Sequence, residues 1–257
     1  MILQVRDLQV SYGKQVVAHI PELDLAEGSI LGIAGESGSG KSQTALALMG
    51  LTRYSGGAVS GSIVLDGKDL TALSRRQWRE VRGREIAMIL QSPRAALNPT
   101  IKLGSLFERT LKLHGVARAD RRERMQQALA EVVLDAEILG RYPHQVSGGQ
   151  AQRFAIALVA ALRVKVLIAD EPTSALDVTV QSEVIEVLRG LRERHGTSIV
   201  FISHDLAVIS ELADDLMVMR NGAVVERGSA QGVLSAPTEE YTRDLIAAVP
   251  TIRSAAP

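Results

Sequence analysis

Residues 35–42 read Gly35-Glu36-Ser37-Gly38-Ser39-Gly40-Lys41-Ser42, with the apolar run 30–34 before them and a helical run from Gln43 to Met49 after them. This octapeptide fits the phosphate-loop pattern G-x-x-x-x-G-K-[ST], and a strand before it with a helix after it is the context that the pattern requires. The glycines let consecutive backbone N–H groups turn inward around phosphate oxygens, where the N-terminus of the helix adds a favourable field. The stretch therefore predicts a nucleotide phosphate site, with Lys41 on the outer phosphates and the Ser42 hydroxyl on Mg²⁺.

Two carboxylates follow a second apolar run. Residues 166–169 read as a buried strand that leads directly into Asp170 and Glu171. Beside a phosphate loop, an acid at the end of a strand is typical of a residue that holds the Mg²⁺ shell, and its neighbour of a general base that polarises a water. The pattern therefore indicates nucleotide hydrolysis, with Asp170 on the metal and Glu171 as the base.

Apolar periodicity predicts the fold class. The apolar runs 30–34, 166–169 and 199–202 are separated by helical patterns, which favours a parallel sheet with crossover helices. The first sixty-odd residues are β-rich, and the pairs Asp66-Gly67 and Asn221-Gly222 predict tight hairpin turns. The stretch from Ser92 to Val146 shows no buried strand. We therefore expect an α/β phosphate-loop fold with a parallel core sheet, an N-terminal antiparallel β subdomain and an inserted α-helical subdomain.

Apolar stripes predict two of the helices. One stripe has the spacing of a helix that closes at Gly196, and a second lies within the helical insertion. The first consists of Val180, Val184, Val187, Leu188 and Leu191, and the second of Met125, Leu129, Val132 and Val133. Arginines 118, 121, 122 and 124 surround the start of the second helix, interrupted by acids and without interleaved aromatics. A solvated helix face is favoured over a nucleic-acid patch for this cluster.

Composition excludes several classes of protein. The chain has 257 residues and no cysteine, so disulfides, thiolate metal sites and cysteine nucleophiles are impossible. Lys plus Arg number 29, as do Asp plus Glu, so there is no global basic field of the kind that nucleic-acid binders use. The longest apolar run, 154–162, is far shorter than the ~18–20 residues that cross a bilayer.

A third motif, Ser147-Gly148-Gly149-Gln150, opens a helix rich in small and apolar residues. By itself this motif is an N-cap with a flexible lead-in. Its place in the chain adds meaning, because it follows the phosphate loop and precedes Asp170-Glu171, and His204 comes after all three.

In this order and spacing the chain resembles the nucleotide-binding subunit of an ABC transporter, over nearly its whole length. The resemblance implies that Tyr12 stacks on adenine, that Gln91 links Mg²⁺ and the attacking water to the transport domain, and that His204 is the switch histidine. It implies that 147–150 reach the γ-phosphate bound to a partner subunit, and that Ser174-Ala175-Leu176-Asp177 crosses the dimer interface. The implied catalytic residues are Lys41, Gln91, Glu171 and His204, and the implied metal ligands are Ser42, Gln91 and Asp170. The implied ATP-binding residues are Tyr12, Gly35, Glu36, Ser37, Gly38, Ser39, Gly40, Lys41, Ser42, Gln43, Asp170, Ser147, Gly148, Gly149, Gln150 and Asp177.

Three further segments are similar to the peptide and nickel importer ATPases. The segment 91–99 (Gln-Ser-Pro-Arg-Ala-Ala-Leu-Asn-Pro) resembles the Q-loop of that group, and 142–145 and the tail from Tyr241 to Pro250 are similar as well, with Glu240 where the group usually has proline. Longer members carry a cysteine-containing C-terminal extension, which this chain lacks. The resemblance is therefore to the shorter members, several of which serve nickel or metal-chelate uptake, and the implied solute is a peptide, nickel or a metal chelate.

The resemblance also implies an organisation. A single ABC ATPase domain spans 1–257, with a core formed by 1–91 and 147–235, a helical subdomain at 92–146 and a C-terminal tail at 236–257. The implied partners are a second ABC ATPase subunit, identical or different, two polytopic permease subunits and, indirectly, a solute-binding protein, with no nucleic acid. The implied location is the cytoplasmic face of the cell membrane.

Two alternative functions and one alternative residue role remain open from the sequence. The chain could be an accessory nucleotide-binding subunit of a metabolic enzyme complex of the phosphonate-breakdown type, or an ABC ATPase acting on nucleic acid or the ribosome. Leu97 is an apolar residue in a polar, turn-rich stretch. It either lines a groove for a permease helix or packs inside the helical subdomain.

Overall fold

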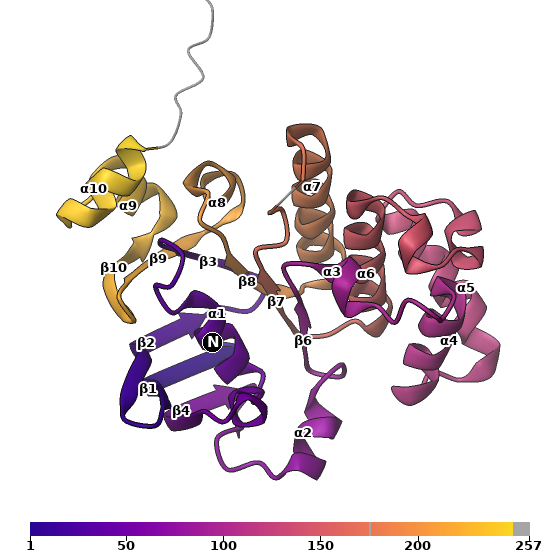
Figure 1. The fold of residues 1–257 in the computed structure, drawn as a ribbon, viewed down its shortest axis with the longest axis horizontal. Helices are drawn as coiled ribbons and strands as arrows, with labels where there is room; N and C mark the ends of the chain where they lie inside the picture. Colours follow the sequence, from indigo (N-terminus) through magenta and orange to yellow (C-terminus); the bar gives the residue numbers. More distant parts are fainter. Residues whose placement is uncertain (175, 249–257) are drawn as a thin grey trace, which may run out of the picture.

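The computed structural model describes residues 1–174 and 176–248, and within them one ten-stranded sheet connects the whole molecule (Figure 1). The order of its strands is β5-β4-β1-β2-β10-β9-β3-β8-β7-β6. The strands are β1 (Leu3–Tyr12), β2 (Gln15–Leu25), β3 (Ile30–Ala34), β4 (Ala58–Leu65), β5 (Lys68–Asp69), β6 (Ile86–Ile89), β7 (Val166–Asp170), β8 (Ser198–Ile202), β9 (Asp215–Arg220) and β10 (Ala223–Ser229).

Helices cover the sheet and fill the interval between β6 and β7. The α-helices are α1 (Lys41–Leu48), α2 (Arg75–Val81), α3 (Pro93–Ala96), α4 (Leu103–Leu113), α5 (Arg118–Glu131), α6 (Gly148–Leu162), α7 (Val178–His195), α8 (Leu206–Leu212), α9 (Ala230–Ser235) and α10 (Glu240–Ala247). The 3₁₀ turns are η1 (Thr52–Ser55), η2 (Ala136–Gly140) and η3 (Pro143–Gln145). No helix in the described ranges has the length and apolarity to cross a membrane.

The central strands confirm the expected parallel core. β3 pairs in parallel with β8 and β9, and β7 pairs in parallel with β8 and β6. Every residue of β3, β7 and β8 is buried, as continuous apolar runs with helices on both faces require. β6, which lies in the apolar run 86–90, was not among the strands predicted from the sequence.

The N-terminal strands form the expected antiparallel part of the sheet. β1 pairs antiparallel with β2 and β4, and β9 with β10. Both predicted tight turns are present, since Asp66, Gly67, Asn221 and Gly222 all have positive φ. The antiparallel strands join the rest of the sheet through β2 and β10, where the register contains one residue pair, Ala223 with His19.

Two apolar cores lie on opposite faces of the central strands. Successive residues of β3 alternate between them: Ile30 and Ala34 belong to the core that includes α6, α7 and α8, whereas Leu31 and Ile33 belong to the core that includes α1 and β1. Figure 1 shows α3 to α6 gathered on the side of the molecule away from β1, β2 and β4. The sheet thus separates a helical side from an antiparallel β side.

The interval 92–146 contains helices and turns and no strand within its described residues, as expected. One detail of the sequence analysis is wrong. Helix α5 ends at Glu131, so Val133 is not on its buried stripe but 77% exposed, with a φ of 53°. The helix is closed by a C-terminal turn in which left-handed Val133 donates its N–H to Ala130 O at 3.1 Å and Leu134 N donates to Leu129 O at 2.9 Å.

The structure also bears on the arginine cluster and on Leu97, whose role the sequence left open. Arg118 and Arg122 are exposed, as a solvated face requires, but Arg121 and Arg124 are half-buried. Their guanidinium groups donate to backbone carbonyls, those of Val116 and Ala161, and Arg121 also pairs with Glu108 at 2.8 Å. Leu97 is only 9% exposed and packs in the helical-side core, which favours its packing role over the docking role.

Candidate functional site

The phosphate loop runs between β3 and α1 and is held from outside by the β9–β10 turn. Gly35 has a φ of 146°, and a Cβ at this position would overlap the carbonyl oxygen of Met219. The N–H of Gly222 donates to the carbonyl of Ser39 at 3.0 Å. The loop borders a pocket of about 390 Å³ that is lined by Val17, Ser37, Gly38, Gly40, Lys41, Ser42, Gln43, Gln91 and Glu171.

Lys41 is buried at the inner side of this loop, with 4% of its surface exposed. Its Nζ donates to the carbonyl oxygens of Gly35 and Glu36, at 2.6 and 2.8 Å. Burial lowers the pKa of the ammonium, against the opposing effect of the nearby carboxylates of Glu171, Asp170 and Glu36. Burial disfavours the charged form of Lys41, and an anion bound in the pocket would stabilise that charged form again. The site is therefore suited to phosphate.

Ser42 and Asp170 form the side of the pocket that is suited to a metal. The Ser42 hydroxyl donates to Asp170 Oδ1 at 3.1 Å. Burial raises the pKa of the Asp170 carboxyl, and the Glu171 charge adds to this, while the Ser42 hydrogen bond opposes it. A hydroxyl, a carboxylate and the amide oxygen of Gln91 are ligands that Mg²⁺ accepts together with substrate phosphates. Among the described residues, no group of three or more His, Cys, Asp or Glu side chains is arranged to hold a metal ion.

Glu171 lines the pocket and contacts two of the other predicted residues. Gln91 Nε2 donates to its Oε2 at 2.9 Å, and His204 Nδ1 lies 3.3 Å from its Oε1. Glu171 has a φ of 47°, a left-handed conformation that is uncommon outside glycine and is enriched at functional sites. The structure therefore brings Gln91, Glu171 and His204 together from three separate strand ends.

Tyr12 and Gln43 lie together at the end of β1. The Tyr12 hydroxyl donates to Gln43 Oε1 at 2.9 Å and is 2.7 Å from Ser55 Oγ. Tyr12 is half-buried. Gln43 also lines the phosphate pocket, whereas Tyr12 does not, so Tyr12 is connected to that pocket through Gln43.

Ser147 to Gln150 form a second cluster, which contributes nothing to the lining of the phosphate pocket. Ser147 caps α6: its Oγ accepts from Gln150 N at 3.1 Å, and Gln150 Oε1 accepts from Ser147 N. Gly149 packs against Val180 of α7. Asp177 caps α7 by accepting from Val180 N at 3.0 Å. Ala175 and the tail residues 249–257, which include Val249 and Pro250, lie outside the described residues.

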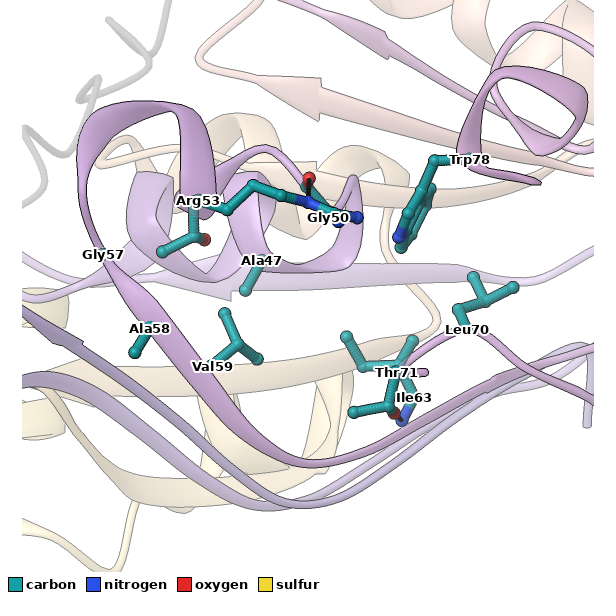
Figure 2. A pocket seen from close by; sticks show the side chains of 11 residues that line it. Ala47, Gly50, Arg53, Gly57, Ala58, Val59, Ile63, Leu70, Thr71 and Trp78 are labelled. Atoms are coloured by element: carbon teal, nitrogen blue, oxygen red, sulfur yellow. Dashed lines mark hydrogen bonds between the residues drawn. The ribbon is translucent and has the colours of Figure 1, made fainter. Parts of the chain in front are cut away.

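A separate cavity of about 330 Å³ lies between the C-terminal end of α1 and β4 (Figure 2). Figure 2 shows Trp78 beside Gly50 at one end and Ala58 and Val59 at the other. It shares no lining residue with the phosphate pocket, so it is not part of the predicted nucleotide site.

Two contacts at the phosphate loop were not anticipated from the sequence. Val17 of β2 lines the pocket, and the hydroxyl of Tyr241 in α10 accepts from Glu36 N at 3.1 Å. Neither residue lies near the loop in the sequence, so no local pattern could have revealed these contacts.

Comparison with known proteins places the chain in a family. The family model described as "ABC transporter" matches residues 19–174, more than half of the chain. The peptidoglycan transport ATP-binding protein YejF of Agrobacterium fabrum is 43% identical over 97% of this chain, which spans about half (47%) of that protein. The dipeptide transport ATP-binding protein DppD of Escherichia coli is 41% identical over 97% of this chain and 78% of its own length.

A solved structure agrees with these matches. The bacterial ABC transporter cassette MJ0796, whose structure is dimeric, is 25% identical, with a TM-score of 0.79 over 90% of this chain and 99% of that chain. The expected family and fold class are thereby confirmed. A phosphate loop, a strand-end Asp-Glu pair and a chain-long match lead to one conclusion: the chain belongs to the ABC transporter family of ATPases.

Proposed function

We propose that this chain hydrolyses ATP to drive the import of a peptide-class solute through separate permease subunits. The observation that carries the proposal is the position of Glu171, which lines the phosphate pocket and contacts both Gln91 and His204. A carboxylate in this position can orient and deprotonate a water that attacks the γ-phosphate in line.

The other pocket residues have complementary roles in this mechanism. The loop N–H groups and Lys41 bind the outer phosphates, because the Lys41 ammonium has a third donor beyond the two held by the carbonyls of Gly35 and Glu36. Gln91 and His204 hold the Glu171 carboxylate on either side and position it toward the water. Ser42, Asp170 and Gln91 would hold Mg²⁺, which when bound neutralises charge on the phosphates.

We infer that the working unit is a pair of cassettes. Ser147 to Gln150 do not line the phosphate pocket of their own chain, and they lie with Asp177 in a separate cluster. A head-to-tail pair would bring the 147–150 segment of one chain to the pocket of the other. The dimeric structure of the related cassette MJ0796 supports this arrangement.

The solute and location are inferred from relatives. The two relatives above are named for dipeptide and peptidoglycan transport, which favours a peptide over nickel or a metal chelate. The chain would act at the cytoplasmic face of the membrane on two permease subunits, fed by a solute-binding protein, and would bind no nucleic acid. The second ATPase subunit is either identical or a different chain.

Two substitutions test the hydrolysis mechanism as a matched pair. Glu171→Gln keeps the size and most contacts of the side chain but cannot accept a proton, so turnover should fall by at least about 100-fold while ATP affinity changes little. Lys41→Ala should instead weaken ATP binding itself, because it removes the cation from the outer phosphates. Steady-state ATPase assays and calorimetric ATP titrations of the purified chain separate these two effects. Wild-type turnover by the Glu171→Gln variant would show that Glu171 is not the base.

A further inference from the structure

The C-terminal helix α10 reaches the phosphate loop through one hydroxyl group. The N–H of Glu36 donates to the Tyr241 hydroxyl oxygen at 3.1 Å, across 205 residues of sequence. Tyr241 is 6% exposed, so water does not compete freely for this bond. Helix α10 is therefore hydrogen-bonded directly to the phosphate loop.

The bonded peptide unit is the same one that holds Lys41. The carbonyl of Gly35 and the N–H of Glu36 belong to one planar peptide, and because this peptide is trans the two groups point in opposite directions. Lys41 Nζ donates to that carbonyl at 2.6 Å, on the side of the pocket. One rigid plane thus links the Tyr241 hydroxyl on its outer side to the Lys41 ammonium on its inner side.

Tyr241 is itself fixed by two neighbouring strands. The guanidinium of Arg220, at the end of β9, lies 4.6 Å from the centre of the Tyr241 ring. The Glu226 carboxylate of β10 accepts from Thr238 N at 2.7 Å, from Thr238 Oγ1 at 2.9 Å and from Glu239 N at 3.3 Å. Glu226 is buried, with 8% exposed, and these bonds anchor the segment that leads into α10.

We propose that Tyr241 is a positioning residue of the nucleotide site, acting through the Gly35–Glu36 peptide on Lys41. Its hydroxyl keeps that peptide from rotating, so the carbonyl that receives Lys41 stays on the pocket side and the loop is preorganised for phosphate. This role rests on the proposed ATP hydrolysis. Without the hydroxyl, the Glu36 N–H loses its partner and the plane that orients Lys41 loses its outer restraint.

The test uses Tyr241→Phe in the full chain, with Leu245→Ala as the matched control. The phenylalanine keeps the ring that packs against Arg220 and removes only the acceptor. Leu245 is a half-buried residue of the same helix, and its truncation loosens the packing of α10 without touching the hydroxyl. We expect Tyr241→Phe to raise the KM for ATP about three- to tenfold, the effect of one lost hydrogen bond, with kcat changed less than about twofold. Leu245→Ala should keep the wild-type KM even where it lowers the melting temperature.

A second measurement is independent of hydrolysis. In nucleotide-free protein the Glu36 amide should exchange with deuterium faster in Tyr241→Phe than in wild type, because its acceptor is gone. A Tyr241→Phe variant with wild-type KM, in a wild-type protein that does hydrolyse ATP, would overturn the positioning role alone. An equal rise of KM in Leu245→Ala would reduce Tyr241 to a packing residue. A wild-type chain that protects Glu36 but neither binds nor hydrolyses ATP would overturn the proposed function and the role built on it.

Discussion

Burial of the Asp170 carboxylate lowers the stability of the folded protein, and this penalty exists only while the carboxyl is ionised. The side chain is 7% exposed, and burial raises its pKa above that of the unfolded chain. The penalty is therefore absent at pH values below the unfolded pKa, and it grows as the pH rises through the folded pKa. At neutral pH the nucleotide-free protein holds a buried negative charge near Glu171, offset in part by Lys41.

We therefore expect Asp170→Asn to stabilise the nucleotide-free protein at neutral pH, although it removes a metal ligand. The amide oxygen can still accept from Ser42, and the charge is gone. The melting temperature should rise by about 2–4 °C for each kcal/mol recovered. Thermal melts across pH check the sign, because the difference between variant and wild type should shrink toward acid pH. A variant that is less stable than wild type at neutral pH would contradict a destabilising charge at this position.

Individual site residues were predictable where the residues that act together are neighbours in the sequence. The loop 35–42 and the pair Asp170-Glu171 are contiguous, so the sequence alone brings their groups together once a strand is recognised. Gln91 and His204 were assigned only by resemblance to a family, since the contacts to Glu171 depend on strand order. The contact between Tyr241 and Glu36 depends on how α10 packs in the tertiary structure, and no sequence periodicity encodes it.

At the scale of elements, the burial of Leu97 at the end of α3 favours packing over docking as the role of this residue. Leu97 forms its C-cap and is 9% exposed within the helical-side core. Leu113, at the end of α4, is 76% exposed. The two leucines provide a buried and an exposed probe of the same helical region.

Leu97→Ala should lower the free energy of unfolding by about 2–4 kcal/mol, because it removes buried methyl groups and leaves a cavity. Leu113→Ala should change it by less than about 0.5 kcal/mol, as surface truncations usually do. Denaturant melts of the isolated chain give both values. If the two variants melted alike, Leu97 would not be a packing residue and its docking role would regain support.

Several features of these elements were not predicted from the sequence. β6 lies in the apolar run 86–90, which is as long as the runs that were recognised as strands, so its own pattern could have revealed it. Val133 continues the apolar spacing of α5 but lies beyond the residue at which the helix ends. Arg121 has the composition of a solvated face, yet its guanidinium finds a carbonyl and a carboxylate on its neighbours. Local periodicity does not encode the residue at which a helix ends or the tertiary partners that a side chain finds.

At the scale of the whole molecule, the separation of Ser147 from the phosphate pocket predicts complementation between chains. Lys41→Ala disables the pocket of a chain, and Ser147→Asp places a negative charge where the partner's phosphate would lie while keeping a good N-cap for α6. Each variant alone should be inactive. In an equal mixture about half of the pairs are mixed, and each mixed pair has one intact site of two, so activity should recover to about a quarter of wild type.

ATPase assays of the two variants, alone and mixed at several ratios, measure this recovery. The activity should reach its maximum at the equal ratio and vanish at either extreme. Activity that stayed at the level of the separate variants at every ratio would contradict a site shared between copies of this chain.

The junction at Gly222 links the two sides of the sheet to the nucleotide pocket. The same residue donates its N–H to Ser39 of the phosphate loop and accepts from His19 N at 2.6 Å, beside the one residue pair that joins β2 to β10. A shift of this turn would therefore move β2 and the phosphate loop together. The antiparallel strands and the nucleotide pocket are mechanically connected through a single glycine, so a force applied at the edge of the sheet reaches the phosphates through main-chain hydrogen bonds alone.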